Sequence, residues 1–238
     1  MKKHYWFILL TYVLVLFSAP AGIPLLKWLG VDPGQIFGIW NIIAFSIGLI
    51  IILFLLRKDR GENDLRGEPA SPASSAGWAF GGIFLAFFAQ IIAANIETQL
   101  LGIPAGSENT QQIMEIVKST PLMIFVVSIA GPILEEIVFR KILFGTIYKK
   151  TNFILAAVIS SVIFAVVHGD PAHILLYSAM GFTFAFLYVK TKRIIVTIIA
   201  HLSMNTFVVI IQYVFADDIQ KMLEEAEKLQ SIIGGISL

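Results

Sequence analysis

The chain has 238 residues, of which 57% are hydrophobic and only 14% are charged, and its mean hydropathy is +0.83. Water-soluble domains carry roughly 45–50% apolar and about 25% charged residues, so this composition indicates a membrane protein. Seventeen Lys and Arg residues against sixteen Asp and Glu residues give a net charge of +1, which argues against a polybasic nucleic-acid-binding protein. The chain has no cysteine, which excludes disulfides, Cys-ligated metals and a thiol nucleophile, so any metal would need His and carboxylate ligands.

Apolar stretches long enough to cross a bilayer follow one another along the chain. A helix rises about 1.5 Å per residue, so crossing about 30 Å of hydrocarbon takes about 20 residues. Seven stretches approach this length and predict an all-α, polytopic transmembrane helix bundle, with an eighth span left open. They cover residues 5–26, 35–56, 78–101, 121–147, 152–168, 173–189 and 194–215. The first could instead be a signal peptide ending in Ala-Pro-Ala, but its apolar run continues to Leu26, which favours a retained helix.

Three polar segments separate or follow these spans. Residues 57–77 are rich in Pro, Ser, Gly and charge, which predicts a solvated loop. Residues 107–120 place apolar side chains at helical spacing, which predicts a short helix on the membrane surface. Residues 216–238 alternate acidic and basic side chains, which predicts an exposed helical tail. The chain therefore divides into N-terminal spans (1–118), spans that carry the polar motifs described below (119–215) and the tail (216–238).

Lys and Arg residues are unevenly distributed between the two ends of the predicted spans. If the N-terminus is cytoplasmic, twelve of the seventeen fall in cytoplasmic segments and four in outer segments, and Arg140 lies within a span. Cytoplasmic loops of membrane proteins are enriched in Lys and Arg. We therefore expect a multi-pass protein of the cell membrane with a cytoplasmic N-terminus.

The fourth span contains three charged residues, Glu135, Glu136 and Arg140. Each costs about 2.5–3.5 kcal/mol on insertion scales, so such residues usually mark a functional site. Arg140 follows Glu136 by four residues, so the two can form an ion pair on one helix face. Glu135 lies about 100° around the helix and has no partner within it. Either Glu135 is a reactive group, or both carboxylates pair with Arg140 or a histidine and only fix the helix packing.

The four histidines extend this pattern. His201 and Asn205 are four residues apart, so they project from one face of the last span. A single histidine in an apolar helix is usually a hydrogen-bonded packing residue. Two such histidines, His168 and His201, together with an asparagine and an unpaired glutamate in three helices of one bundle, indicate a site. We expect His173 to begin a helix after its Gly-Asp-Pro turn, and His4 to be solvated.

Patterns of several known intramembrane proteases are absent: there is no H-E-x-x-H, no G-x-S-G and no presenilin-type aspartate pair. Three other motifs occur on successive spans. They are E-E-x-x-x-R from Glu135 to Arg140, F-x-x-x-H from Phe164 to His168, and H-x-x-x-N from His201 to Asn205. These motifs resemble, without substitution, those of the CPBP family, which comprises type II CAAX prenyl endopeptidases and bacteriocin-processing or self-immunity proteins, also called the Abi family. The resemblance covers about residues 119–212.

This resemblance implies an intramembrane endopeptidase that hydrolyses peptide bonds of membrane-associated proteins or peptides. Glu135 would be the general base that activates a water, with His168 sharing or orienting the proton. His201 and Asn205 would polarise the scissile carbonyl and stabilise the oxyanion, which donors in a water-poor site do well. The supporting residues would be Glu136 and Arg140, which hold the helix and tune Glu135, and Phe164, which packs against His168.

The sequence determines neither the cofactor nor the membrane face from which the site is reached. Glu135, His168 and His201 could supply three ligands of a catalytic zinc ion, or another divalent metal, with an open fourth position. The same residues would serve a metal-free glutamate protease. The three motifs also fall at unequal depths in their predicted spans, so the sequence does not indicate which membrane face the site opens to.

Two functions of other classes are alternatives to the protease. A non-catalytic membrane scaffold, such as an immunity protein, would tolerate the loss of Glu135 or His201. A proton-coupled transporter could use the same groups as a relay, but no broken helices recur in two halves, as they do in transporter repeats.

Overall fold

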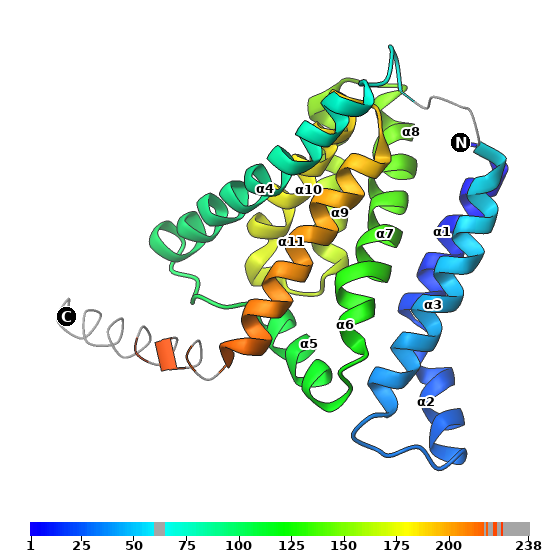
Figure 1. Ribbon diagram of the computed structural model, residues 1–238, viewed down its shortest axis with the longest axis vertical. Coiled ribbons are helices and arrows are strands. Elements are labelled where there is room, and N and C mark those ends of the chain that lie inside the picture. The colour runs from blue at the N-terminus through cyan, green and yellow to red at the C-terminus, as the bar shows by residue number, and fades with distance from the viewer. Residues whose placement is uncertain (60–64, 217, 219–220, 223–224, 226–238) are drawn as a thin grey trace.

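The computed structural model describes residues 1–59, 65–216, 218, 221–222 and 225, which form helices and short connections with no strand (Figure 1). The predicted all-α class is therefore confirmed. The longer helices are α1 (Lys3–Leu16), α2 (Ala19–Trp28), α3 (Ile36–Leu56), α4 (Pro72–Leu100), α5 (Glu108–Ser119), α9 (Phe153–Val167), α10 (Ile174–Thr191) and α11 (Ile194–Val214). One further segment is built from α6 (Met123–Phe125), η2 (Val126–Ala130), α7 (Gly131–Glu135), η3 (Glu136–Phe144) and α8 (Gly145–Tyr148). Two short 3₁₀ turns are η1 (Arg57–Asp59) and η4 (Pro171–His173).

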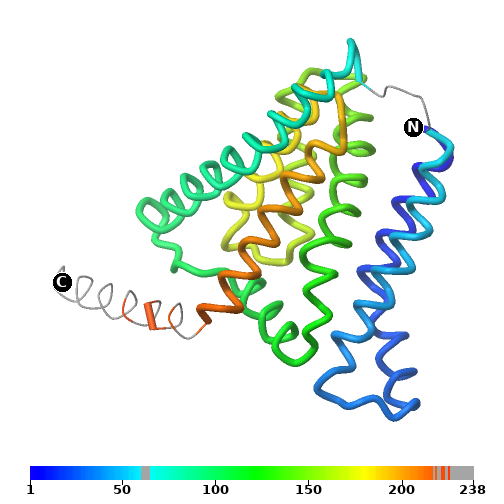
Figure 2. Tube along the Cα trace, viewed as in Figure 1, coloured from blue at the N-terminus to red at the C-terminus, as the bar shows by residue number. Residues whose placement is uncertain are grey.

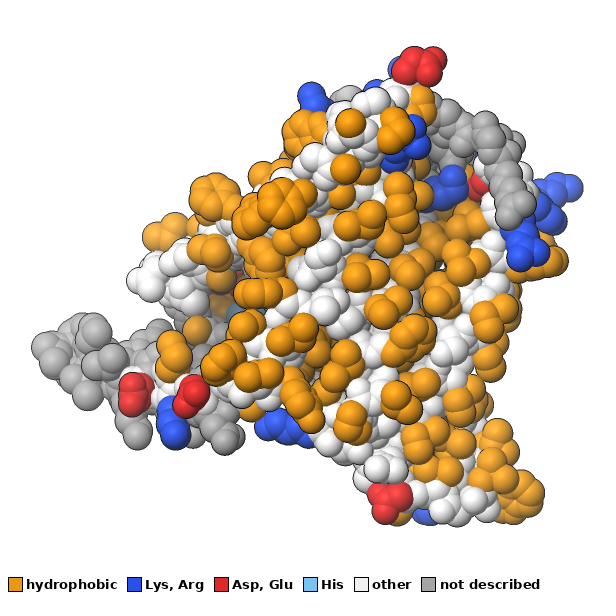
Figure 3. Space-filling model, viewed as in Figure 1, with side chains coloured by type: hydrophobic (Ala, Val, Ile, Leu, Met, Phe, Trp, Pro, Cys, Tyr) orange, Lys and Arg blue, Asp and Glu red, His pale blue; other side chains and the backbone are white. Residues whose placement is uncertain are grey.

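Each predicted span except the first corresponds to a helix or a continuous helical segment, and the first is divided into α1 and α2. The segments that contain α3, α4, α10 and α11 are long and apolar enough to cross a membrane, and α1 with α2 makes a fifth candidate bent by 51°. Helix α9 is shorter, and the segment α6–α8 carries the charged first motif. Large apolar side chains such as Trp6, Ile50 and Phe80 are more than 60% exposed. Figure 3 shows apolar side chains spread over the face of the bundle in view. These features confirm a helical membrane protein, while the count of seven spans stays a prediction.

The bend between α1 and α2 has a local cause. Pro20 lies in the first turn of α2 and has no N–H with which to continue the preceding helix. Ser18 at the break donates its hydroxyl to the carbonyl of Val15 (2.9 Å) and accepts from the indole Nε1 of Trp40 (2.8 Å). These hydrogen bonds satisfy polar groups at the break and attach it to α3.

The interior is built where helices approach closely. Helix α10 packs against α9 and α4, and Gly181 of α10 lies against Ser161 of α9, so that an added Cβ would come within 2.8 Å of the Ser161 backbone. Small residues at helix contacts let backbones approach in membranes. The largest buried cluster includes Leu134, Phe164 and Phe184 and surrounds the motif residues.

The two ends of the bundle differ in their polar contacts. At the end that holds the N-terminus, the Asp59 carboxylate lies 2.7 Å from Lys2 Nζ and 3.0 Å from His4 Nε2, so His4 is not simply solvated. The backbone at Ala70 accepts from Arg193 Nε at the same end (2.7 Å). The opposite end is made by α2, by α5 and by the loops before and after α5, as the tube in Figure 2 shows.

The predicted surface helix forms, and the predicted loop ends earlier than expected. Helix α5 forms within the segment predicted as a surface helix, and Ser107 caps it by accepting from the backbone N–H of Thr110 (3.2 Å). The third span begins at Pro72, inside the predicted loop, because Ser71 is a favourable N-cap and Pro72 a favourable first residue. Most of the predicted helical tail, 216–238, lies outside the described residues.

Candidate active site

The first motif forms a buried ion pair, as its spacing predicts. Arg140 Nη1 lies 3.1 Å from Glu136 Oε1, and both side chains are almost completely buried. The guanidinium also lies over two aromatic rings, 4.2 Å from the centroid of Phe164 and 5.2 Å from that of Phe184. A desolvated cation over aromatic faces is stabilised by their quadrupoles. Phe164 therefore contacts the arginine of the first motif as well as the histidine of its own.

His201 joins this ion pair to Glu135. Its Nδ1 lies 2.8 Å from Glu136 Oε1, and its Nε2 lies 3.7 Å from Glu135 Oε2. Because a carboxylate accepts hydrogen bonds, Nδ1 carries the proton that is donated to Glu136. The Nε2 atom is thereby the one directed toward Glu135. The ring stacks on Phe184, with centroids 4.6 Å apart and planes 21° apart, which fixes its orientation.

His168 is held by the backbone of its own helix. Its Nδ1 lies 2.8 Å from the carbonyl oxygen of Phe164, which can only accept, so Nδ1 carries the hydrogen and Nε2 is left for chemistry. The rings of Phe164 and His168 are 4.5 Å apart at 61°. This contact agrees with the predicted packing of Phe164 against the imidazole.

Asn205 is anchored by a widened helical turn. The N–H of Gly131 bonds to the carbonyl of Val126 in a π-type turn, so it no longer serves the carbonyl of Val127. The next residue, Pro132, has no N–H to offer. The Val127 carbonyl is instead satisfied by Asn205 Nδ2 at 3.2 Å. The π-helical turn thus connects the first motif to the third.

A cavity of about 520 Å³ brings the motifs together. The residues of the motifs that line it are Glu135, Phe164, His168, His201 and Asn205. Its other walls come from the C-terminal halves of α1, α4 and α11, from the N-terminal half of α3, from α5 and the loop before it, from α6, η2 and α7, and from the start of α10. Glu135 keeps 19% of its side chain exposed, whereas His201 keeps only 4%. The residues placed at unequal depths by their predicted spans therefore share one space.

The same cavity tests whether these residues form a metal site. In the part of the chain that the structure describes, no three His, Asp or Glu side chains are grouped so that they could hold a metal ion. The Nδ1 atoms of both histidines are already bonded, which leaves one nitrogen on each for a ligand or a proton. The expected zinc site therefore stays a prediction.

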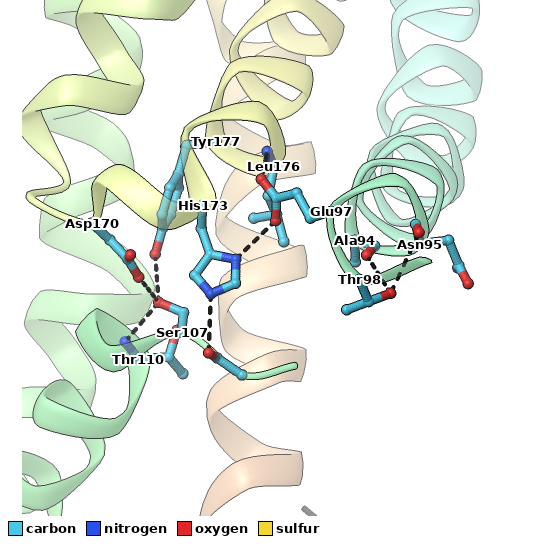
Figure 4. Close-up of polar contacts among 11 residues, drawn as sticks. Ala94, Asn95, Glu97, Thr98, Ser107, Thr110, Asp170, His173, Leu176 and Tyr177 are labelled. Carbon is cyan, nitrogen blue, oxygen red and sulfur yellow. Dashed lines mark hydrogen bonds and ion pairs between the residues drawn. The ribbon is translucent and has the colours of Figure 1, made fainter. Parts of the chain in front are cut away.

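The sequence analysis did not predict a second polar cluster, which lies beside the cavity (Figure 4). Glu97, 1% exposed, accepts from the backbone N–H of Leu176 (2.9 Å) and bonds to His173 Nδ1 (2.8 Å). His173 Nε2 donates to the carbonyl of Gly106 (3.0 Å). The signal was present, because Glu97 is the one charged residue in the predicted third span. This cluster ties the end of α4 to the start of α10 and to the loop before α5.

Comparisons with known proteins place these residues in a family. Residues 117–207 match the family described as type II CAAX prenyl endopeptidase Rce1-like. YdiL of Bacillus subtilis (strain 168), a membrane peptidase by name, is 50% identical over 247 aligned positions that cover all of both chains. The membrane-embedded CAAX protease MroQ of Staphylococcus aureus (strain USA300) is 34% identical over 88% of each chain. The chain belongs to the CAAX protease family.

Membership in the CAAX protease family supports the function of a membrane peptidase. It also agrees with the family resemblance that the three motifs indicated. A shorter match, 38% identical over 84 residues, joins 35% of the chain to 46% of the UPF0177 protein YxdF of Lactococcus lactis. No solved structure matches the chain. All three motifs lie within the matched family range, 117–207. The roles of their individual residues stay predictions.

Proposed function

We propose that this CAAX protease family member is an endopeptidase in which Glu135 activates a water molecule inside the cavity. The observation that carries the proposal is the arrangement of Glu135 with two histidines that are each fixed at Nδ1. Glu135 Oε2 and His201 Nε2 are 3.7 Å apart, a separation at which one water can bridge the two. General bases act best when they are held within reach of the proton that they remove, directly or through one water.

The proposed reaction is a direct hydrolysis. Glu135 takes a proton from the water, and the resulting hydroxide oxygen forms a bond to the carbonyl carbon of the peptide. As the carbon–nitrogen bond breaks, Glu135 returns the proton to the leaving amine nitrogen. His168 lines the same cavity and orients the water through Nε2. Atoms and charges balance in this sequence without any further reactant.

The oxyanion of the tetrahedral intermediate would accept hydrogen bonds from His201 and Asn205. One N–H of the Asn205 amide is used by Val127, and the amide has a second one to donate. A proton on His201 Nε2 would make the second donor, and Glu136 beside Nδ1 would stabilise the imidazolium, as the buried carboxylate does in serine protease triads. With His201 protonated, its charge and that of Arg140 balance those of Glu135 and Glu136.

The position of the cavity suggests where the substrate enters. Eleven described Lys and Arg residues belong to segments that meet at the end of the bundle with the N-terminus, namely the start of α1, η1, the segment before α4, the last part of η3, the residues after α8, and the end of α10 with the residues after it (Figure 1). Lys27, Lys118 and Lys221 belong to α2, to α5 and to the segment after α11. By the positive-inside rule the N-terminal end is cytoplasmic. The cavity is walled by α5 and by the loop at Gly106 and Ser107, at the opposite end. We therefore propose that membrane-associated peptides reach the site from the extracytoplasmic side.

The test compares peptide termini in cells that carry the wild type or Glu135→Gln at equal abundance. Mass spectrometry should reveal new termini that depend on the wild type and disappear in the variant, since removing a general base lowers rates by about 10²–10⁴-fold. Identical termini in both strains would contradict the proposal and favour a non-catalytic scaffold. Repeating the cleavage with purified protein and 1,10-phenanthroline separates the mechanisms. Activity that persists supports the metal-free route, and activity that is lost and restored by zinc supports the metal site.

A further inference from the structure

Tyr177 contacts the candidate catalytic histidine from a different helix. It lies near the start of α10 and lines the cavity, and its ring is stacked on that of His168, with centroids 4.1 Å apart and planes 29° apart. His168 is the C-cap residue of α9, where its Nδ1 donates to the carbonyl of Phe164 and its ring packs edge-on against the Phe164 ring. Both contacts come from a residue one turn earlier in the same helix. Stacking on Tyr177 adds a contact from a second helix.

The hydroxyl of Tyr177 is itself held in a directional chain of hydrogen bonds (Figure 4). Ser107 Oγ donates its single proton to Asp170 Oδ2 at 2.7 Å. The contact of 3.0 Å between Ser107 Oγ and Tyr177 Oη is therefore donated by the tyrosine. Tyr177 Oη in turn accepts from Asn109 Nδ2 at 3.2 Å.

Every hydrogen-bonding position of Ser107 is used in this arrangement. The hydroxyl donates to Asp170 and accepts both from Tyr177 and from the backbone N–H of Thr110. A hydroxyl has one donor and two acceptor positions, so its geometry is fully determined. Ser107 is also the N-cap of α5. The orientation of the Tyr177 ring is thereby set by the helix that forms one wall of the cavity.

We propose that Tyr177 is a positioning residue that fixes the imidazole of His168 for hydrolysis and makes its position depend on the N-terminus of α5. The proposal rests on the proposed function, in which His168 orients the attacking water. Misplacing a reactive group by about 1 Å can cost about 10²-fold in rate, so a ring held from its own helix benefits from a constraint on a second helix. A substrate that displaces the start of α5 would shift Tyr177 and His168 together.

The neighbouring polar cluster of Glu97 and His173 supports a fixed position for this wall of the cavity. Glu97 and His173 hold the carbonyl of Gly106 and the N-terminus of α10, on either side of the Ser107 and Tyr177 contacts. The loop before α5 is thus fixed at the carbonyl of Gly106 by the cluster of Glu97 and His173, and at the side chain of Ser107 by Tyr177 and Asp170. His168 is contacted by Tyr177 and not by Glu97 or His173 in the described structure, so the two clusters can be separated by substitution.

The experiment measures kinetics and histidine reactivity in the full chain, purified in detergent. Tyr177→Ala should lower kcat by about tenfold to a hundredfold with KM nearly unchanged, whereas Tyr177→Phe, which keeps the ring, should lose much less. The substrate is a quenched fluorescent peptide that spans a cleavage site found by terminus mapping. Diethyl pyrocarbonate modification of His168, followed by mass spectrometry, should be faster in Tyr177→Ala than in the wild type. Tyr213→Ala, at an exposed position on α11, is the matched control and should change neither readout.

The two readouts separate this proposal from the proposed function. If the wild type cleaves nothing but Tyr177→Ala still speeds the modification of His168, the positioning contact stands and the endopeptidase proposal fails. If folded Tyr177→Ala keeps both the wild-type kcat and the wild-type modification rate, the positioning role is overturned. Should Tyr177→Ala not accumulate in membranes, Tyr177→Leu, which better preserves the side-chain volume, is measured by the same criteria.

Discussion

At the scale of single residues, the site is a chain of ionisable side chains that contact one another. Arg140, Glu136, His201 and Glu135 follow one another at 3.1, 2.8 and 3.7 Å, and each inner member has a partner on both sides. The pair of Glu136 and Arg140 was predictable from the sequence, because i,i+4 spacing places both on one helix face. The bond from His201 to Glu136 was not, because it depends on how α11 packs against η3. The sequence left open whether the carboxylates pair with Arg140 or with a histidine, and the structure joins Glu136 to both Arg140 and His201.

Removing Arg140 tests the energetic role of this chain. Arg140→Ala leaves the completely buried Glu136 without its cation, and breaking such a pair costs about 3–5 kcal/mol. We expect a lower midpoint of thermal unfolding in detergent. The double variant Glu136→Gln/Arg140→Ala, which removes the stranded charge, should recover part of the loss. Arg66→Ala, at an exposed position, is the control, and an unfolding midpoint of Arg140→Ala equal to that of the control would contradict the prediction.

At the scale of elements, irregular helical turns decide where the polar groups lie. The sequence predicted one regular span over residues 121–147, and the structure has two π-helical stretches within it. Such insertions are frequent at functional sites, but no spacing rule for a regular helix reveals them. The pairing of Asn205 with the Val127 carbonyl follows from the turn and from Pro132 together. The candidate residues could therefore be listed from the motifs, while their contacts could not.

Replacing Pro132 tests whether this turn matters to the reaction. Pro132→Ala supplies the missing N–H, which can pair with the Val127 carbonyl and release the Asn205 amide. Cleavage should fall, by no more than the roughly 10²–10³-fold typical of a lost oxyanion donor. The double variant Pro132→Ala/Asn205→Ala should be no slower than Asn205→Ala alone, because both changes remove one contribution. Pro171→Ala is a proline control at an exposed position, and full activity in Pro132→Ala would refute the anchoring role.

At the scale of the whole molecule, composition, the lengths of the apolar stretches and three motifs predicted the fold class and the family. An all-helical membrane protein and its family were accessible from apolar lengths and three short motifs, because both signals are local in sequence. The location of the cavity could not be predicted, because the cavity is formed by residues of helices that are distant along the chain. The loop before α5, for which the sequence predicted no role, forms part of the wall of the cavity.

The orientation of the bundle can be measured directly because the chain has no cysteine to remove. Glu115→Cys on α5 and Glu68→Cys at the opposite end are both exposed, and neither changes the number of Lys and Arg residues. In intact cells a membrane-impermeant maleimide should label only Glu115→Cys, and opening the cells should add Glu68→Cys. Both variants should react fully in detergent, which is the control. The reverse pattern would place the cavity on the cytoplasmic side.

The short distances within the site have a consequence for an energised membrane. A potential of 100 mV changes the energy of an elementary charge that crosses the whole bilayer by about 2.3 kcal/mol, and a charge that moves part of the way experiences the corresponding fraction. In the proposed reaction the proton passes from the water to Glu135 and on to the leaving amine, and Glu135 Oε2 lies only 3.7 Å from His201 Nε2. A path of this length is about a tenth of the roughly 30 Å of hydrocarbon. We therefore expect nearly the same rate of hydrolysis in polarised and depolarised vesicles, and a rate that changed several-fold with the potential would contradict a short proton path.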